Sequence, residues 1–411
     1  MKRTILIIFV LMTLLLFATD TITVKRNHAV LRSGPGSFYP VTAQLPVDSN
    51  LRVIEKYKGW LQVEFKNQEG FVSAKVSISK NKKKNDWENM AKPDTEVEIA
   101  QMGMTAGVKG FAEKISEKLD SDPSFISYFM NYNIDPSSYK KFRKKTYKKV
   151  KYKKARRKNH LPTAEKTLYY SFSEQGLGIA IAAKIATMGI YKDKRLTDYL
   201  NNLGNLIVSA SDAYDENFKF FVLDIEQPNA YSCPGGIIFV TKGMLQSINN
   251  EAELACVIGH EIAHVARKHG MKEVDRRVNE IHAETSFDEL DQELESLGRT
   301  EDEEIKSTEE ELEEMSLQIY EIISKGQLAK YEKEADRLGL LYATRAGFNP
   351  KMMLTLLKRM QHASIKSNNE HYSPKQIEKR IGRIKRNLKE LWIPRKSLVN
   401  PKRAQKYLEN L

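Results

Sequence analysis

Two histidines and a glutamate stand out in the segment CVIGHEIAHVARKHG, which is otherwise largely apolar. His260 and His264 are four residues apart, and Glu261 directly follows the first of them. If the segment is a helix, residues four apart lie on one face, so both imidazoles point toward the same place. Two neutral imidazoles are typical zinc ligands, and the carboxylate beside them can take a proton from a water molecule. The alternative is a pair of buried histidines satisfied by hydrogen bonds.

A catalytic zinc ion needs a third protein ligand, which the same segment does not supply. Arg267 and Gly270 occupy the positions where the extended motif has glycine and histidine. His269 is five residues after His264, so on a continuous helix it points away from the site. The third ligand is therefore expected from another part of the chain.

The segment GQLAKYEKEADRLGLLYATRAG offers that ligand. Glu332 and Asp336 are four residues apart and share a helix face. Glu332 can bind zinc, whereas Asp336 can accept a hydrogen bond from the outer nitrogen of a ligand histidine and so orient it. Ala335 and Gly339 are small enough to let a second helix come close. The alternative for both acids is an ordinary solvated helix face.

Two helices must hold these groups in place. Asn250 can cap the first helix, and Glu253, three residues later, completes a capping box. Apolar residues cover most of this helix, so we expect it to cross the core and to end near Gly270. The second helix is expected to end at Gly347, ahead of Pro350.

Together, these motifs resemble the zinc endopeptidase family that contains HtpX, BepA and the CAAX prenyl proteases. The matching residues are His260-Glu261-x-x-His264, Glu332-x-x-Ala335-Asp336-x-x-Gly339 and, upstream, Asn229-Ala230-Tyr231-x-x-Pro234-Gly235-Gly236. The resemblance covers about residues 171–388. It implies hydrolysis of peptide bonds with one Zn²⁺ per chain, held by His260, His264 and Glu332, with Glu261 as the general base.

The resemblance also implies two further groups of site residues. Asn229, Ala230 and Tyr231 belong to a strand that is expected to pair its backbone with an extended peptide or protein substrate. His371 and Arg380 are expected to stabilise the transition state. Arg380-Ile381 is retained here, but His371-Tyr372-Ser373-Pro374 replaces the His-Pro pair of the family.

The only two cysteines lie beside these motifs. Cys233 is in the substrate strand, and Cys256 is one turn before His260. We expect them either to pack as small apolar residues or to offer an inhibitory thiol ligand, and a mutual disulfide is a third alternative.

Residues 22–80 alternate apolar and polar residues in short runs broken by glycine and proline, which predicts a small antiparallel β barrel. Leu31-Arg32-Ser33-Gly34-Pro35-Gly36, Gly59-Trp60 and Gly70-Phe71-Val72 resemble a bacterial SH3 domain. This resemblance implies a cell-wall peptide or an envelope protein as partner. The alternative is a spacer without a ligand.

The first residues have the layout of a secretory signal. Lys2 and Arg3 precede an apolar run from Ile5 to Ala18, which is shorter than the about 20 residues that a membrane span needs. We therefore expect a signal peptide at residues 1–19 and an exported protein in the periplasm, in the cell envelope or outside the cell.

The net charge of +13 is concentrated in one run. KKFRKKTYKKVKYKKARRK, from Lys140 to Lys158, holds 13 lysines and arginines and no acid, so the rest of the chain is neutral on balance. We interpret this run either as a docking surface for an anionic partner such as phospholipid or wall polymer, or as a solvated, partly helical linker. Nucleic acid is not favoured, because no base-reading motif accompanies the charge. An acidic stretch between His282 and Met315 either shields the run or forms a flap.

A chain of 411 residues, 41% of them hydrophobic, is long enough for two or three domains. The expected fold class is α+β, with a mainly helical zinc peptidase domain and its small edge sheet at residues 166–395, preceded by the SH3-like β barrel at residues 22–80. Residues 81–165 are expected to form a linker and a helical region with the basic run, and residues 396–411 a C-terminal tail.

The leading hypothesis is an exported zinc metalloendopeptidase that hydrolyses peptide bonds in envelope protein quality control. The alternative is a non-catalytic adaptor that binds the cell wall or the envelope through the barrel and keeps zinc as a structural ion. The intact HExxH motif disfavours the adaptor, because a structural site has no use for a general base.

Overall fold

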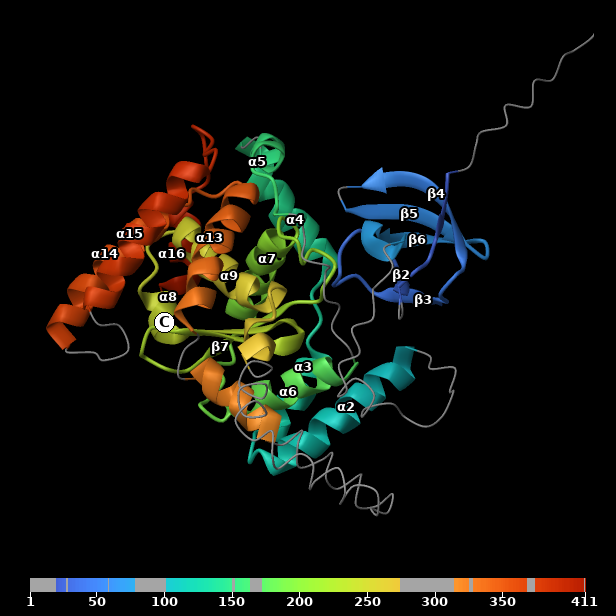
Figure 1. Ribbon diagram of the computed structural model, residues 1–411, viewed down its shortest axis with the longest axis horizontal. Coiled ribbons are helices and arrows are strands. Elements are labelled where there is room, and N and C mark those ends of the chain that lie inside the picture. Colours follow the sequence, from blue (N-terminus) through green and yellow to red (C-terminus); the bar gives the residue numbers. More distant parts are fainter. Residues whose placement is uncertain are drawn as a thin grey trace, which may run out of the picture. The chain divides into compact units, whose positions relative to one another are not determined.

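The computed structural model describes residues 20–26, 29–57, 59–77, 101–149, 152–162, 172–273, 314–324, 328–367, 374–409 and 411. The chain divides into an N-terminal unit, residues 1–35 and 41–80, and a larger helical unit, residues 36–40 and 81–411 (Figure 1). The expected signal peptide and most of the acidic stretch lie outside the described residues. Among the helices that the structure describes, none is long and apolar enough to cross a membrane.

The N-terminal unit is a six-stranded antiparallel sheet in the order β1-β4-β5-β6-β2-β3. Its strands are β1 (Thr21–Thr23), β2 (Ala29–Arg32), β3 (Val41–Leu45), β4 (Asn50–Tyr57), β5 (Trp60–Phe65) and β6 (Gln68–Ser73). Leu31, Leu51 and Val63 are fully buried in its core. A register shift between Val53 and Glu55 bends the sheet around that core. The antiparallel β structure expected for residues 22–80 is confirmed.

The larger unit is mainly helical. Its helices are α2 (Gln101–Lys118), α3 (Pro123–Asn131), α4 (Pro136–Thr146), α5 (Tyr152–Lys158), α6 (Phe172–Ala186), α7 (Lys194–Val208), α8 (Lys242–Gln246), α9 (Glu251–Ala266), α13 (Ala329–Arg345), α14 (Met352–Ser367), α15 (Pro374–Glu390) and α16 (Pro401–Leu408). Residues 314–324 are helical as well.

A small three-stranded sheet lies between two groups of helices (Figure 1). β7 (Lys219–Leu223) runs parallel to the central strand β9 (Ile237–Thr241), and β8 (Ala230–Cys233) pairs antiparallel with β9 at the edge. Phe220 and Ile238 face a core shared with α7, α9 and α13, whereas Phe221 and Phe239 face a second core shared with α2, α3 and α6. Neighbouring strand residues point to opposite faces, so both faces are apolar. The expected α+β fold class is confirmed.

The site helix α9 begins where the sequence predicts. The Asn250 side chain accepts hydrogen bonds from the backbone N–H groups of Ala252 and Glu253, both at 3.1 Å. The Glu253 carboxylate accepts from the N–H of Asn249 at 2.8 Å and forms an ion pair with Arg359. The capping box is therefore closed one residue earlier than in the usual pattern, in which Glu253 would bond the N–H of Asn250.

Residues 396–411, which were expected to form a C-terminal tail, contribute to the core of the helical unit. Leu398, Ala404 and Leu408 are buried in the same cluster as residues of α7 and α9. Arg403 Nε lies 2.6 Å from the carboxylate of Glu251, in the first turn of α9. Glu251 has no exposed surface, and a buried charge without a partner is strongly destabilising. The last helix therefore neutralises the start of the site helix.

The described residues of the basic run form two helices that pack on the helical unit. Its helices α4 and α5 bury Tyr139, Tyr152 and Ala155. The hydroxyl of Tyr147, between the two helices, donates to the carbonyl of Ala346 just after α13 at 3.0 Å. Most of the described lysine and arginine side chains of the run are exposed, so α4 and α5 present them on an ordered surface.

Helices α9 and α13 cross at two glycines. A Cβ atom at Gly259 would lie 2.7 Å from the carbonyl oxygen of Gly339, and one at Gly339 would lie 2.6 Å from the backbone nitrogen of His260. Both distances are too short for any side chain, and the obstacle is helix backbone in each case. The expected close approach of a second helix at Gly339 is therefore present, and it brings the two candidate ligand segments together.

Replacing Gly339 with alanine is expected to destabilise the protein by about 1–3 kcal/mol, because the added methyl group overpacks the crossing. It should also weaken Zn²⁺ binding, since Glu332 moves away with α13. In an uncrowded helix the change from glycine to alanine would stabilise the protein by about 1 kcal/mol. The sign of the change in unfolding free energy therefore tells whether the helices are in close contact. Thermal unfolding measures this change in stability, with the exposed substitution Arg337→Ala on the same helix as the control. An unchanged or higher Tm would contradict the close crossing.

Candidate metal centre

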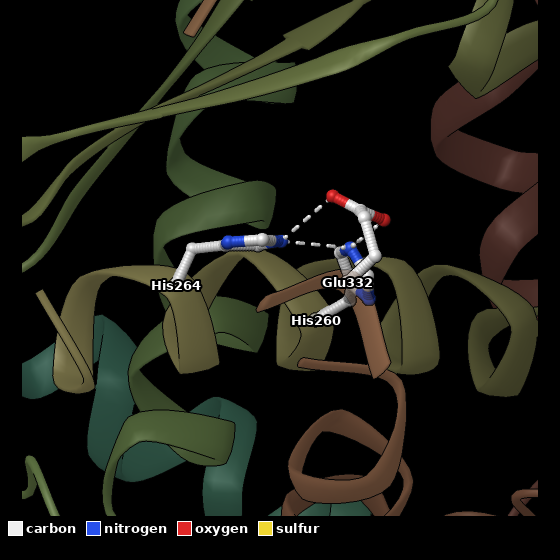
Figure 2. Close-up of side chains that lie close together, drawn as sticks. All are labelled: His260, His264 and Glu332. Atoms are coloured by element: carbon white, nitrogen blue, oxygen red, sulfur yellow. Dashed lines mark hydrogen bonds and ion pairs between the residues drawn. The ribbon is translucent and has the colours of Figure 1, made fainter. Parts of the chain in front are cut away.

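Side chains from α9 and α13 converge on one point (Figure 2). The Nε2 atoms of His260 and His264 are 3.0 Å apart, and the two Glu332 oxygens lie 3.4 Å and 3.3 Å from them. These three donors all lie within 4.8 Å of one another. Tetrahedral ligands about 2.0–2.1 Å from a zinc ion are about 3.3 Å apart, so the donor spacing fits that ion.

The chemistry of the donors also favours a cation. His260 and His264 are only 6% and 4% exposed, so both rings are shielded from bulk solvent. The outer nitrogen of each ring has its own partner, at 3.2 Å for His260 and 3.0 Å for His264. Both inner nitrogens can therefore present lone pairs beside the Glu332 carboxylate. The lone pairs and the carboxylate repel one another unless a positive charge lies between them. Hydrogen bonds between the two histidines alone do not explain it.

The charges of the site depend on one another. Burial raises the pKa of Glu332, but His260 and His264 outweigh this effect and hold it well below its usual range. Burial and Arg380 lower the pKa of His260, whereas Glu332 and Asp336 raise it, with a net value of about 9. The site thus favours positive charge between its donors, as a proton or as a metal ion that displaces it.

Asp336 is the partner of the outer nitrogen of His260. Its Oδ1 lies 3.2 Å from Nδ1 of His260, and its side chain is almost fully buried. Arg380 Nε donates to Oδ1 at 3.0 Å, and Arg383 donates twice to Oδ2, at 2.8 Å and 2.6 Å. Burial raises the pKa of Asp336, but Arg380 and His260 reverse the effect and lower it. The carboxylate is therefore ionised and fixed in orientation.

Arg380 lies on the outer side of His260. Its Nη2 is 3.3 Å from Nδ1 of that ring, the nitrogen that faces away from Glu332. Arg383, one turn later on α15, shares the task of holding Asp336 and was not predicted. The sequence could have indicated Arg383, because a residue three positions after Arg380 lies on the same face of a helix. The other candidate for transition-state stabilisation, His371, lies outside the described residues.

His269 contacts His264, which corrects the expectation that it points away. The helix α9 ends at Ala266 and not near Gly270, and Lys268 adopts a left-handed φ of 53°. This reversal places Nδ1 of His269 at 3.0 Å from Nδ1 of His264. Burial, followed by the neighbouring His264, lowers the pKa of His269 to about 2, so its ring is neutral.

Glu261 is on the helix that packs against the edge strand β8. It is 9% exposed and follows His260 on α9. At Cys233, the end of β8, burial and then the charge of Glu261 raise the pKa of the thiol.

The expected substrate strand forms an open edge. Asn229 directly precedes β8, and Ala230 and Tyr231 are its first residues, paired with Val240 and Phe239 of β9. Among the described strands, none pairs with the other side of β8. The N–H of Asn229 donates to the Thr241 hydroxyl at 2.8 Å, and the N–H of Ala230 donates to the Asn229 side chain at 2.9 Å, so the start of the strand is anchored.

Both cysteines are free and buried. Cys256 faces the carbonyl of Pro350 at 3.9 Å, and burial raises the pKa of its thiol to about 12. In the part of the chain that the structure describes, the metal-ligating group consists of His260, His264 and Glu332. The cysteines therefore pack as small apolar residues here, and neither joins the site.

Comparison with known proteins agrees with this geometry. Residues 194–388 match peptidase family M48, and residues 27–77 match the bacterial SH3 domain. The beta-barrel assembly-enhancing proteases of Yersinia pestis and Escherichia coli K12 are each 28% identical to the chain, over 183 and 182 residues, which are 44% and 42% of this chain and 35% and 34% of theirs. The mitochondrial metalloendopeptidase OMA1 of Schizosaccharomyces pombe is 28% identical over 186 residues, 43% of this chain and 49% of its own.

The chain spans about a third of the length of the two bacterial relatives. The family match contains every residue placed at the metal centre above, because it runs from α7 to the end of α15. The part of the chain that holds the metal centre therefore matches peptidase family M48, and residues 27–77 match the bacterial SH3 domain.

Proposed function

We propose that this protein is a zinc-dependent metalloendopeptidase that hydrolyses internal peptide bonds. The observation that carries the proposal is the convergence of His260, His264 and Glu332, from two helices, within 4.8 Å. These three residues would hold a Zn²⁺ ion, which would supply Lewis-acid chemistry by making a water molecule more acidic and polarising the scissile carbonyl.

The protein's own groups perform the proton transfers. Glu261 accepts the proton of the attacking water and passes it to the leaving amine. An extended substrate pairs with the open edge of β8 at Asn229, Ala230 and Tyr231, a mode that reads backbone more than side chains. Arg380 acts through Asp336 on the orientation of His260, and His371 remains a candidate for stabilising the transition state.

We further propose that the protein is exported and acts in the periplasm or the cell envelope. The layout of residues 1–19 supports export, and two bacterial relatives are named beta-barrel assembly-enhancing proteases. Misassembled envelope proteins are then the substrate class, and the bacterial SH3 domain is a module for a cell-wall peptide or an envelope protein.

Metal analysis of the purified protein beside a casein assay tests the enzyme proposal. We expect one Zn²⁺ per chain, cleavage of casein, loss of cleavage with a chelator and its return with Zn²⁺. A metal-free protein, or cleavage that survives complete removal of the metal, would overturn it.

The rival function is a non-catalytic envelope adaptor that works through the bacterial SH3 domain. Complementation of cells that lack the protein distinguishes this function from peptidase activity. Glu261→Gln restores the adaptor's function but not the peptidase's, so rescue by this variant would favour the adaptor.

The basic run supports a second, independent activity, which is binding to an anionic phospholipid surface. Replacing Lys141, Lys144, Lys145 and Lys153 with glutamate is expected to weaken binding to phosphatidylglycerol-containing vesicles at least tenfold, because each lysine near such a surface contributes about 1 kcal/mol. These lysines are exposed, whereas deletion of the whole run would remove the buried Tyr152 and Ala155.

The control for the vesicle experiment carries the same number of charge reversals elsewhere. Lys358, Lys375, Lys379 and Lys385 are exposed on α14 and α15, so their replacement changes the net charge equally. Co-sedimentation with vesicles measures both variants. Equal losses would mean that only net charge matters and would remove the case for a surface at α4 and α5.

A further inference from the structure

The two candidate ligand histidines have different partners at their outer nitrogens. His260 faces the carboxylate of Asp336, whereas His264 faces a second imidazole, that of His269, at 3.0 Å between the two Nδ1 atoms. His269 has no exposed surface, and its ring stacks on Tyr331 with centroids 4.6 Å apart. Its other nitrogen, Nε2, lies 3.3 Å from the Glu334 carboxylate.

These contacts determine where the protons lie. Glu334 can only accept, so Nε2 of His269 carries the proton. A neutral imidazole has a single N–H proton, which leaves Nδ1 of His269 as an acceptor for the Nδ1–H of His264. The inner Nε2 of His264 is then unprotonated, and this is the form that binds a metal ion.

The far end of this chain of contacts is anchored to the protein. Arg267, at the C-cap of α9, places Nε 3.3 Å from Glu334 and its Nη2 2.8 Å from Asp212. Asp212 also accepts a hydrogen bond from the hydroxyl of Tyr342. Glu334 therefore forms an ion pair with a cationic side chain that is itself held by Asp212.

We propose that His269 is a positioning residue which, supported by Glu334 and Arg267, holds His264 in the tautomer and ring orientation that bind the metal. The inference rests on the proposed metal site and concerns only how the protein prepares it. The left-handed Lys268, which ends α9 four residues early, serves to bring His269 back to His264.

Replacing His269 with leucine is expected to weaken Zn²⁺ binding by about 10- to 100-fold, the usual cost of losing a group that orients a ligand histidine. His269→Asn should restore most of the affinity, because its amide oxygen can accept from Nδ1 of His264. Competition with a chelating dye measures the affinity in the full chain, and circular dichroism shows that each variant is folded.

Glu334→Gln is a second variant that preserves shape. The side chain of Glu334 is 36% exposed, so this change leaves the core packed. An amide can donate to Nε2 of His269, which would reverse both hydrogen bonds and place a proton on the inner nitrogen of His264. We therefore expect a loss of Zn²⁺ affinity, of about tenfold or more, without a change in the apoprotein fold.

Tyr331→Leu is the matched control, because it removes the ring stacked on His269 but leaves its hydrogen bonds. Wild-type affinity in His269→Leu and Glu334→Gln would overturn this inference while leaving the enzyme proposal intact. An equal loss in Tyr331→Leu and His269→Leu, with no recovery in His269→Asn, would also overturn it, since packing would then explain the effect. A wild-type protein that binds no Zn²⁺ would overturn both proposals.

Discussion

Replacing Glu261 with glutamine is expected to slow the cleavage of casein by about 10²- to 10⁴-fold, the range that a general base contributes, while the Zn²⁺ content stays at one per chain. Glutamine has nearly the same shape and cannot accept the proton of the attacking water. Glu261 is not among the three converging donors, so the metal is retained. Metal analysis and the initial rate of cleavage, measured on the same preparation, check both parts.

A matched change on an exposed glutamate controls for the loss of one charge. Glu378 lies exposed on α15, and Glu378→Gln should cleave casein at the wild-type rate. If Glu261→Gln cleaves as fast as wild type, the proposed proton transfer is wrong. If it loses Zn²⁺ instead, Glu261 holds the metal centre together and its role as base is unsupported.

Replacing Glu332 with alanine is expected to remove both the metal and the activity. The two remaining imidazoles come from one helix, and the site loses the donor that joins α9 to α13. The affinity should fall by more than the about 10- to 100-fold that follows the loss of an orienting group. After dialysis against a weak chelator, metal analysis should find less than one Zn²⁺ per chain and no cleavage of casein.

Thermal unfolding gives an independent readout of the same substitution. A metal that binds only the folded state stabilises it by about 4 kcal/mol when its free concentration is 1,000 times its Kd. A chelator should therefore lower the Tm of the wild-type protein and of the exposed control Arg337→Ala, but should hardly change that of Glu332→Ala. A chelator effect of full size in Glu332→Ala would mean that the metal has another third ligand.

The two substitutions separate the parts of the site. Glu261→Gln should bind metal without catalysis, whereas Glu332→Ala should lose both. The helix crossing at Gly259 and Gly339 explains why ligands from two segments meet, because backbone contact at these glycines sets the distance between α9 and α13.

Local periodicity accounts for what the sequence predicted at the site. Residues four apart on a helix lie on one face, so the common face of His260 and His264 and that of Glu332 and Asp336 follow from spacing alone. The Asn250 cap acts within one turn and was equally readable. Alternating residues likewise predicted the antiparallel strands of residues 22–80, because side chains of a strand alternate between its two faces.

The sequence by itself thus determined the metal donors' faces, the fold class and the resemblance to a zinc peptidase family. Only the tertiary structure decided how the donors are supported. The left-handed residue that returns His269 to His264 is Lys268, and a lysine does not predict such a conformation as a glycine would. Arg403 contacts Glu251, which is 152 residues away in the sequence. Such contacts leave no periodic signal, because they depend on which distant segments pack together, and packing is set by the whole core rather than by the neighbours of one residue.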